Sequence, residues 1–498
     1  MQFQSNTPAA DPHAEAVRAL RAGRLAEALA HAERAVAGST ACSPAHGLLA
    51  AILLRLGRPA EADAVIESAL RHAHGVGQAY DALGQVSLAL GRHERANALF
   101  RRAVQLDPSA PAHWFNLASS ERAFGRLAQA EAACDQAIAL DEREYRSYLL
   151  RAELRVQTPA ANHIGQLRSQ LARPGLDAHA RVLLGYALGK ELDDLGRYDE
   201  AFGAFSLAAL ERRRLLAYDV AVDEHKLRRI IEAFPCDPQH TAGGAVDSSR
   251  FVFIVGLPRS GTTLLERILT GLPAVRSNGE TDHFARTLLS ASPAQPAAAD
   301  GPAQDLFARA AAADWNAVAA GYIRRADPHD SGEVVLEKQP MNYLYLGAIH
   351  RALPRARLVL VSRSPLDICF AMYRTLFGEA YQFSYDFDDL ARYYAAYSRL
   401  IAHWRAAFGE SLFEVRYEDL VSDPSRVGER LARWCGLKWR DGAVEIERNE
   451  ALCLTQSAAQ VRRPIYRSST GRWRHYRAHL EPLIDALRRE GVSLAELD

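Results

Sequence analysis

The sequence predicts a two-part protein, in which an all-helical N-terminal half precedes an α/β half with a central parallel sheet. Three observations support this prediction. A Gly-Arg pair recurs in the first half at a spacing of 34 residues, two short apolar runs in the second half each precede a polar loop and a helix, and turn formers fill residues 236–250 between them. Because 498 residues exceed what one hydrophobic core accommodates, separate domains are expected.

The repeated Gly-Arg pair lies between stretches with apolar residues at helical spacing. Its glycines are Gly23, Gly57, Gly91, Gly125 and Gly196, and an alanine follows each by five residues (Ala28, Ala62, Ala96, Ala130 and Ala201). The last glycine is two periods and three residues beyond the fourth. A single helical hairpin cannot bury its apolar face, whereas stacked hairpins share a continuous core.

These units resemble the tetratricopeptide repeat family, with a small residue where the two helices of a unit cross. The resemblance predicts about six units over residues 13–235, with a degenerate one near 143–180, where Pro159 and Pro174 interrupt the pattern. Repeats of this family present a concave surface to a partner, so the resemblance implies a protein or peptide partner. The alternative is an irregular helical bundle, which a period that holds four times disfavours.

The second domain is predicted over residues 251–498, after the linker 236–250. It opens with a buried parallel strand at 251–255, a loop from Gly256 to Thr263 and a helix at 264–269. Backbone N–H groups and the helix dipole converge on an anion at such a loop. The glycine spacing is that of a P-loop, but Thr262 stands where a nucleotide triphosphatase has its lysine, which disfavours ATP or GTP hydrolysis.

The loop string resembles the 5′-phosphosulfate-binding loop of the sulfotransferase family. That family uses the sulfate donor PAPS (3′-phosphoadenosine 5′-phosphosulfate) and releases PAP, its desulfated product. The resemblance implies that the donor binds to Pro258, Arg259, Ser260, Gly261, Thr262 and Thr263.

A second predicted strand, residues 357–361, supports the same resemblance. The family has an arginine directly after such a strand, where it binds the 3′-phosphate of the donor, and Arg363 matches it ahead of a predicted helix at 368–377. The family's serine eight residues further on is Ala371 here, and Arg374 or Thr375 could supply the missing donor group.

The remaining donor contacts are implied by the same family. Residues 412–421 read as a strand that runs into a Tyr-Glu-Asp turn, and Tyr417 is its candidate contact. Ser457 and Arg472 match a serine and a basic residue in the C-terminal segment of the similar tyrosylprotein sulfotransferases, which folds over the donor. Solvated basic residues or salt bridges are the alternative reading of any single arginine in this segment.

Sulfuryl transfer requires a base for the acceptor proton and cations on the transferring oxygens and the leaving phosphate. By its spacing from Arg259, Glu280 matches the catalytic glutamate of the tyrosylprotein sulfotransferases, with His283 and then Asp282 as weaker candidates. Lys338 ends a predicted strand and matches the family's catalytic lysine, and Arg259 is assigned to the sulfate oxygens. No metal is required in this scheme.

Lysine is scarce in the chain, which strengthens the assignment of Lys338. Of 60 basic residues only four are lysines, namely Lys190, Lys226, Lys338 and Lys438. A compact, rotatable ammonium suits a leaving oxygen better than a guanidinium does.

Overall composition excludes several classes of protein. The formal net charge is zero, which gives no general attraction to nucleic acid or to an anionic membrane. The N-terminus has no basic or apolar signal region and no apolar run is long enough to span a bilayer, so a cytoplasmic protein is expected.

Three function classes follow from these motifs. The first is an active PAPS-dependent sulfotransferase, the second a repeat scaffold with a degenerate nucleotide-binding domain, and the third a P-loop kinase or NTPase. The acceptor is open among tyrosine, glycan, lipid and metabolite hydroxyls, with the repeats favouring a protein or peptide. Residues 291–330 are expected to form a mobile or capping insertion beside the acceptor cleft.

Overall fold

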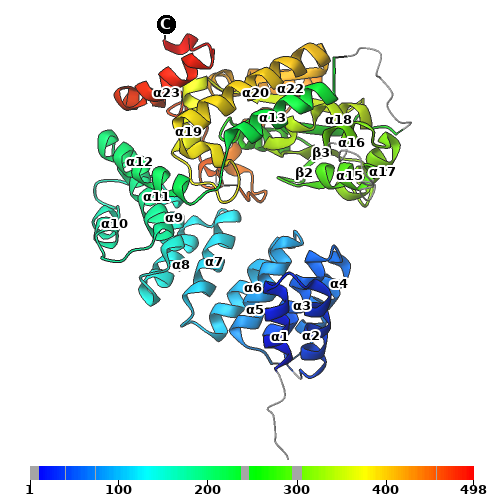
Figure 1. Ribbon diagram of the computed structural model, residues 1–498, viewed down its shortest axis with the longest axis vertical. Coiled ribbons are helices and arrows are strands. Elements are labelled where there is room, and N and C mark those ends of the chain that lie inside the picture. Colours follow the sequence, from blue (N-terminus) through cyan, green and yellow to red (C-terminus); the bar gives the residue numbers. More distant parts are fainter. Residues whose placement is uncertain are drawn as a thin grey trace, which may run out of the picture. The chain divides into compact units, whose positions relative to one another are not determined.

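A computed structural model of the protein describes residues 11–39, 41–72, 74–236, 246–293, 306–455 and 457–497 (Figure 1). The described chain forms two compact units, Met1–Arg155 and Val156–Asp498. The first unit contains helices only, and the second contains helices and one parallel sheet. The predicted combination of a helical half and an α/β half with a central parallel sheet is therefore confirmed.

The first unit is a series of paired antiparallel helices. The helices are α1 (Pro12–Arg21), α2 (Leu25–Ala37), α3 (Pro44–Arg55), α4 (Pro59–Leu70), α5 (Gly77–Ala89), α6 (His93–Leu106), α7 (Pro111–Ala123), α8 (Leu127–Leu140) and α9 (Tyr145–Leu154). Each repeated glycine lies in the turn inside a pair, with φ between 72° and 75°. The five repeated alanines are fully buried, where the two helices of a pair cross. The small residue lets the helix backbones approach, as the period predicted.

The second unit begins with the last helices before the sheet. These are α10 (Ile164–Leu171), α11 (Ala178–Asp194), α12 (Tyr198–Arg214) and α13 (Val220–Ala233). Helices α11 and α12 form a tight hairpin, while α13 runs alongside α20 (Phe387–Phe408) (Figure 1). The compact units therefore divide before residue 156, not at the predicted linker. Residues 237–245 of that linker lie outside the described residues, so the boundary at 236–250 stays a prediction.

The sheet has five parallel strands in the order β2-β3-β1-β4-β5. The strands are β1 (Phe251–Val255), β2 (Val275–Ser277), β3 (Val334–Glu337), β4 (Arg357–Ser362) and β5 (Leu412–Arg416). Strand β1 is buried along its whole length at the centre, as its continuous apolar run predicted.

Helices cover both faces of this sheet because side chains alternate along each strand. Val252 and Ile254 pack toward α14 (Thr262–Thr270) and α22 (Pro424–Trp434) in one core cluster. On the other face, Phe251 and Phe253 contact the ring of Tyr322 on α17 (Trp315–Ala326), which packs on α15 (His283–Ala291).

The buried position of Tyr322 corrects one expectation. Residues 291–330 were expected to form a mobile or capping insertion, but α17 within this range is part of the core. Residues 294–305 of the range lie outside the described residues.

The remaining helices are α16 (Leu306–Ala311), α18 (Leu346–Ala352), α19 (Pro365–Tyr373), α21 (Tyr417–Ser422) and α23 (Arg477–Arg489). Short 3-10 turns lie at Pro340–Leu344, Gln382–Tyr385, Gly409–Ser411, Asp441–Val444, Ile446–Arg448, Gln460–Arg462, Arg472–Tyr476 and Ala495–Leu497. The helix predicted at 368–377 starts three residues earlier, because Pro365 suits a first helical turn, and it ends four residues earlier.

Within the described ranges, no helix is both long and apolar enough to cross a membrane.

Candidate active site

Five of the sequence-predicted site residues follow the carboxyl ends of the five strands. In the spatial order of the sheet, from β2 to β5, they are Glu280, Lys338, Arg259, Arg363 and Tyr417. Ligands of open α/β sheets bind at this edge, and neighbouring strands are about 4.8 Å apart. The topology therefore brings together a carboxylate, an ammonium and two guanidinium groups that lie up to 104 residues apart in the chain.

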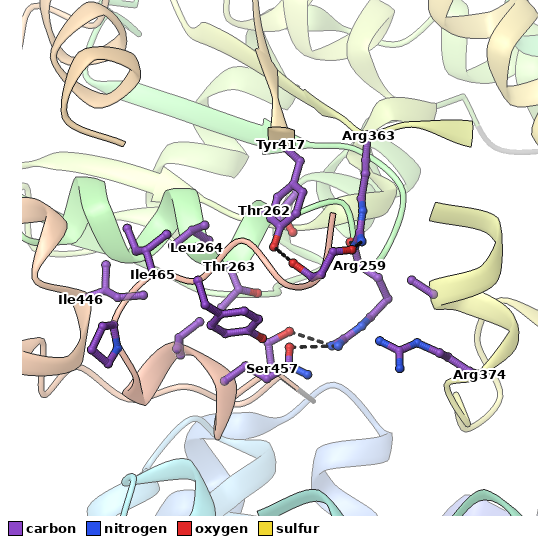
Figure 2. A pocket seen from close by; sticks show the side chains of 17 residues that line it. Arg259, Thr262, Thr263, Leu264, Arg363, Arg374, Tyr417, Ile446, Ser457 and Ile465 are labelled. Atoms are coloured by element: carbon purple, nitrogen blue, oxygen red, sulfur yellow. Dashed lines mark hydrogen bonds between the residues drawn. The ribbon is translucent and has the colours of Figure 1, made fainter. Parts of the chain in front are cut away.

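The loop after β1 has the backbone geometry of an anion-binding loop. Arg259 has a φ of 68° and Gly261 a φ of 104°, and Gly261 precedes the first turn of α14 without a side-chain cap. The helix therefore begins with backbone N–H groups that no capping side chain occupies, where the helix dipole favours an anion. Figure 2 shows Thr262 and Thr263 of this first turn at the wall of the adjoining pocket.

Replacing Gly261 with alanine is expected to reduce affinity for a phosphorylated ligand of this loop by at least about tenfold. A Cβ at Gly261 would lie 2.4 Å from Cδ2 of Tyr417, in addition to the strain of its positive φ. Calorimetric titration with PAP measures the effect. Gly436→Ala is the matched control, because Gly436 has a φ of 74° but nothing within 4 Å of an added Cβ. Equal affinity of the two variants would contradict the role of the loop.

Among the described residues, three arginines and no carboxylate line the pocket beside this loop. Its lining residues are Arg259, Gly261, Thr262, Thr263, Leu264, Arg363, Ala371, Arg374, Tyr417, Ile446, Ser457, Gln460, Val461, Pro464, Ile465, Tyr466 and Ser469. Carboxylates outside the lining pair with two of these arginines, Asp367 with Arg363 at 3.8 Å and Asp193 with Arg374 at 2.6 Å, while the pocket itself presents the guanidinium groups, which favours an anionic ligand. Pro258 and Ser260, also predicted as donor contacts, are buried in the loop and do not line this pocket.

Arg259 joins the loop to the C-terminal segment. Its Nη1 donates to Oγ of Ser457 at 2.8 Å, and its Nη2 donates to Oε1 of Gln460 at 2.9 Å (Figure 2). Ser457, predicted to contact the donor, therefore lies beside the loop that carries Arg259. Both of these hydrogen bonds are made to neutral groups.

Arg363 lies deeper in the pocket wall, with its side chain 6% exposed. Its Nη1 donates to the carbonyl of Arg259 at 3.1 Å, and its Nη2 donates to the carbonyl of Ser469 at 2.5 Å. The guanidinium also stacks over the ring of Tyr417, whose hydroxyl is 2.5 Å from Oγ of Ser469. Arg363 thus joins the loop, the first residue of α21 and the C-terminal segment.

Arg472 does not reach this pocket. Its Nη2 lies 2.7 Å from Oδ2 of Asp193 on α11, and the guanidinium is absent from the pocket lining. Arg374, which the sequence offered as a substitute for the serine missing at Ala371, does line the pocket together with Ala371. The geometry therefore favours Arg374 over Arg472 as a ligand of an anion bound there.

Lys338 and Glu280 form an ion pair at the other end of the strand edge. Nζ of Lys338 donates to Oε1 of Glu280 at 2.6 Å and lies 3.7 Å from Oε2 of Glu266. The Lys338 side chain is fully buried, while that of Glu280 is 40% exposed. Neither residue is among the described residues that line the arginine pocket. The carboxylate is open to an incoming molecule and its orientation is fixed by a buried cation.

Glu337, the last residue of β3, holds the loop that carries Glu280. Its buried carboxylate accepts hydrogen bonds from the hydroxyl of Thr281, from Nδ2 of Asn278 at 3.5 Å and from the hydroxyl of Tyr322 at 3.4 Å. Burial raises the pKa of Glu337 to about 7, although these hydrogen bonds lower it. All three donors are neutral, so these hydrogen bonds offset only part of the cost of burying the charge.

Glu337→Gln is expected to raise the free energy of unfolding at pH 8 by about 1–3 kcal/mol, since the amide removes a buried charge. A carboxyl whose pKa is about 7 in the folded state and 4.5 when unfolded loses its stabilising contribution as the pH rises through that window. The increase in the free energy of unfolding that Glu337→Gln gives over the wild type should therefore shrink as the pH falls from 8 toward 4.5. Urea unfolding at a series of pH values measures it, with the exposed Glu410→Gln as control. A pH-independent difference would contradict this account.

Sequence reasoning missed several residues of the pocket. Gln460, Tyr466 and Ser469 line it from the C-terminal segment but have no strand or glycine motif beside them. Their only signal was the density of polar and basic residues over 456–472. Asp193 carried no signal, because it lies in a helix whose pattern reads as an ordinary repeat.

Groups that could bind a metal ion are scarce in this structure. Within the described ranges, no cluster of three or more His, Cys, Asp and Glu side chains has the arrangement of a metal site. Five of the six cysteines are buried free thiols, whereas Cys236 is exposed and its Sγ lies 3.3 Å from Nδ1 of His403.

Comparison with known families finds matches in both parts of the chain. Residues 252–441 match the sulfotransferase family, and residues 19–86 and 82–145 match tetratricopeptide repeats. An uncharacterized protein of Aquifex aeolicus (strain VF5) is 28% identical over 337 residues, which are 66% of this chain. The match spans 44% of the length of that relative.

Solved structures of both kinds are similar to the chain at low sequence identity. The sulfotransferase STF1 of Mycobacterium tuberculosis H37Rv is 17% identical, with a TM-score of 0.28, over 63% of this chain and 96% of its own. The sulfotransferase domain of the Synechococcus PCC 7002 olefin synthase is 17% identical, with a TM-score of 0.30, over 50% and 98%. PilF of Pseudomonas aeruginosa is 19% identical, with a TM-score of 0.30, over 44% and 96%.

Proposed function

Because this chain joins tetratricopeptide repeats to a sulfotransferase-family domain, we propose that it transfers the sulfuryl group of PAPS to an acceptor hydroxyl. The observation that carries the proposal is the arginine pocket at the N-terminus of α14. A donor with phosphate groups at both the 5′ and the 3′ position would offset the charges of Arg259, Arg363 and Arg374.

The pocket supports this donor better than a nucleoside triphosphate. Thr262 stands at the position of the lysine that contacts the β- and γ-phosphates in P-loop enzymes. The cations of this site are instead guanidinium groups on two neighbouring strand ends, those of β1 and β4. The 5′ end of the donor would lie on the loop after β1, and its 3′-phosphate beside Arg363 and Arg374.

Glu280 and Lys338 would then carry out the transfer. The acceptor oxygen forms a bond to sulfur while the bond between sulfur and the 5′-phosphate oxygen breaks, and the acceptor proton passes to the Glu280 carboxylate. Lys338 would stabilise the charge that develops on the leaving phosphate, and Arg259 that on the sulfuryl oxygens. The buried ammonium also keeps the carboxylate of Glu280 oriented before the acceptor arrives.

In the resting ion pair Lys338 orients Glu280, and during transfer the same ammonium would stabilise the leaving phosphate. Its Nζ binds Glu280 at 2.6 Å and keeps Glu266 as a second carboxylate at 3.7 Å. When Glu280 is protonated by the acceptor, its attraction for the ammonium falls, and the ammonium is released toward the leaving phosphate. Proton transfer and leaving-group stabilisation would thus be coupled through one short contact.

The acceptor that we favour is a hydroxyl on a protein or peptide. Stacked tetratricopeptide repeats over residues 19–145 offer a surface for a polypeptide, which a small acceptor does not need. A repeat scaffold with a decayed catalytic half is the second candidate. Only Ala371 favours it, and Arg374 beside Ala371 provides a substitute for the missing hydroxyl.

Calorimetric titration with PAP tests the donor. The full chain is expected to bind PAP without magnesium and to bind adenosine 5′-phosphate at least about tenfold more weakly, since that ligand lacks the 3′-phosphate. Equal affinity for the two nucleotides, or no binding of PAP, would overturn the proposal. Magnesium-dependent binding of ATP in preference to PAP would favour a kinase or NTPase.

A further inference from the structure

Asp193, in the last turn of α11, is a buried carboxylate whose partners Arg374, Arg472 and Tyr476 lie in the C-terminal part of the same compact unit. Its side chain is 4% exposed. Oδ2 lies 2.6 Å from Nη1 of Arg374 and 2.7 Å from Nη2 of Arg472, and the hydroxyl of Tyr476 donates to Oδ1. Burial raises the pKa of Asp193, but the two guanidinium groups outweigh it and the pKa is lowered overall. The carboxylate is therefore ionised at neutral pH.

Arg374 is the partner of Asp193 that faces the donor pocket. It caps the C-terminus of α19 and lines the pocket three residues after Ala371. Figure 2 shows its guanidinium group directed toward that of Arg259. Without a carboxylate behind it, Arg374 would be repelled by the two other arginines of the pocket and by Arg472. Asp193 removes that cost and leaves one face of the guanidinium for a ligand.

The α11–α12 hairpin fixes the end of α19 at a second and a third point. The hydroxyl of Tyr186 on α11 donates to the carbonyl of Tyr373 at 3.1 Å, immediately before Arg374. Nη2 of Arg212 on α12 donates to the carbonyl of Gly378 at 2.6 Å. The backbone on both sides of Arg374 is thus held by buried groups of the hairpin.

We propose that Asp193 is a positioning residue for the donor, through which the α11–α12 hairpin holds Arg374 as a ligand of the donor's 3′-phosphate. This inference rests on the proposed function, because it takes PAPS as the ligand of the pocket. It assigns the hairpin to the donor site itself. Arg374 then takes the place of the hydroxyl that Ala371 lacks, and its geometry is set by a residue 181 positions earlier in the chain.

A double-mutant cycle in the full chain tests the proposal. Asp193→Asn and Arg374→Ala are each expected to weaken PAP binding by roughly 10- to 100-fold, the effect of a lost charged hydrogen bond. The double variant should bind PAP no more weakly than Arg374→Ala alone, because both changes remove one ligand. Affinity for adenosine 5′-phosphate, which lacks the 3′-phosphate, should change less than about threefold in all three variants.

Asp199→Asn is the matched control, since Asp199 on α12 makes an exposed ion pair with His479 across the same hairpin contact. It should bind PAP as the wild type does. Three results would overturn the positioning role. They are additive losses of PAP affinity in the double variant, wild-type PAP affinity in Asp193→Asn or Arg374→Ala, and a loss of affinity for adenosine 5′-phosphate equal to the loss for PAP. Failure of the wild type to bind PAP would instead overturn the proposed function, so the two failures are distinguishable. Arg374→Ala keeps the test decisive if Asp193→Asn does not fold, because the Arg374 side chain is 22% exposed.

Discussion

Glu280→Gln is expected to lower the rate of sulfuryl transfer by about 10²–10⁴-fold while leaving PAP affinity within about twofold of the wild type. The amide cannot take up the acceptor proton, but its oxygen still accepts the hydrogen bond from Lys338. Glu280 is 40% exposed, so the change should not affect folding. Transfer of radioactive sulfate from PAPS measures the rate, with an acceptor found by screening phenols, tyrosyl peptides and glycans.

Asp282→Asn is the control for Glu280, because Asp282 is a neighbouring acid in the same loop and forms an ion pair with the exposed Arg286 at 2.6 Å. This variant should retain wild-type transfer. If Asp282→Asn lost transfer and Glu280→Gln retained it, the base would be Asp282. His283→Asn addresses the remaining candidate, whose pKa is lowered by burial, and should also retain transfer.

Lys338→Met is expected to lower the turnover number by about 10²–10³-fold, the effect of removing one preorganised donor from a developing oxyanion. PAP affinity should fall less, because the ammonium acts mainly on charge that appears as the phosphate leaves. Lys338→Arg should not restore the rate, since the site is fully buried and fits a compact ammonium. Single-turnover transfer and PAP titration together separate the two effects.

Lys438→Met is the matched control for Lys338, because Lys438 is exposed and far along the chain after α22. Its turnover should equal that of the wild type. An equal loss of turnover and of PAP affinity in Lys338→Met would assign the lysine to ground-state donor binding instead of catalysis. The unfolding midpoint of Lys338→Met must be measured as well, because the change leaves Glu266 without its nearest cation.

The local motifs of the sequence determined much of the architecture. A glycine period of 34 predicted paired helices, and each repeated glycine has the positive φ that ends one helix of a pair. Continuous apolar runs predicted β1 and β4, because parallel strands are buried on both faces. These features depend on contacts between residues a few positions apart or on the average hydrophobicity of a segment. Both can be read directly from the order of the residues.

The sequence also determined which residues follow the strands, and therefore which side chains lie at the carboxyl edge of the sheet. Arg259, Arg363 and Lys338 were each predicted from the strand or loop that carries them. Their mutual arrangement came from the strand order, which a single sequence does not reveal. The short contact between Lys338 and Glu280 spans 58 residues and depends on β2 and β3 being neighbours.

Only the tertiary structure decided the roles of the arginines around Asp193. The chain has 56 arginines beside its four lysines, and nothing local distinguishes a guanidinium that binds a carboxylate from one that lines a pocket. Packing of the α11–α12 hairpin placed Asp193 against Arg472, which the sequence had assigned to the donor, and turned Arg374 toward the pocket. Charge pairing over such separations is set by which helices pack together, because an electrostatic partner is chosen by distance in space and not by position in the chain.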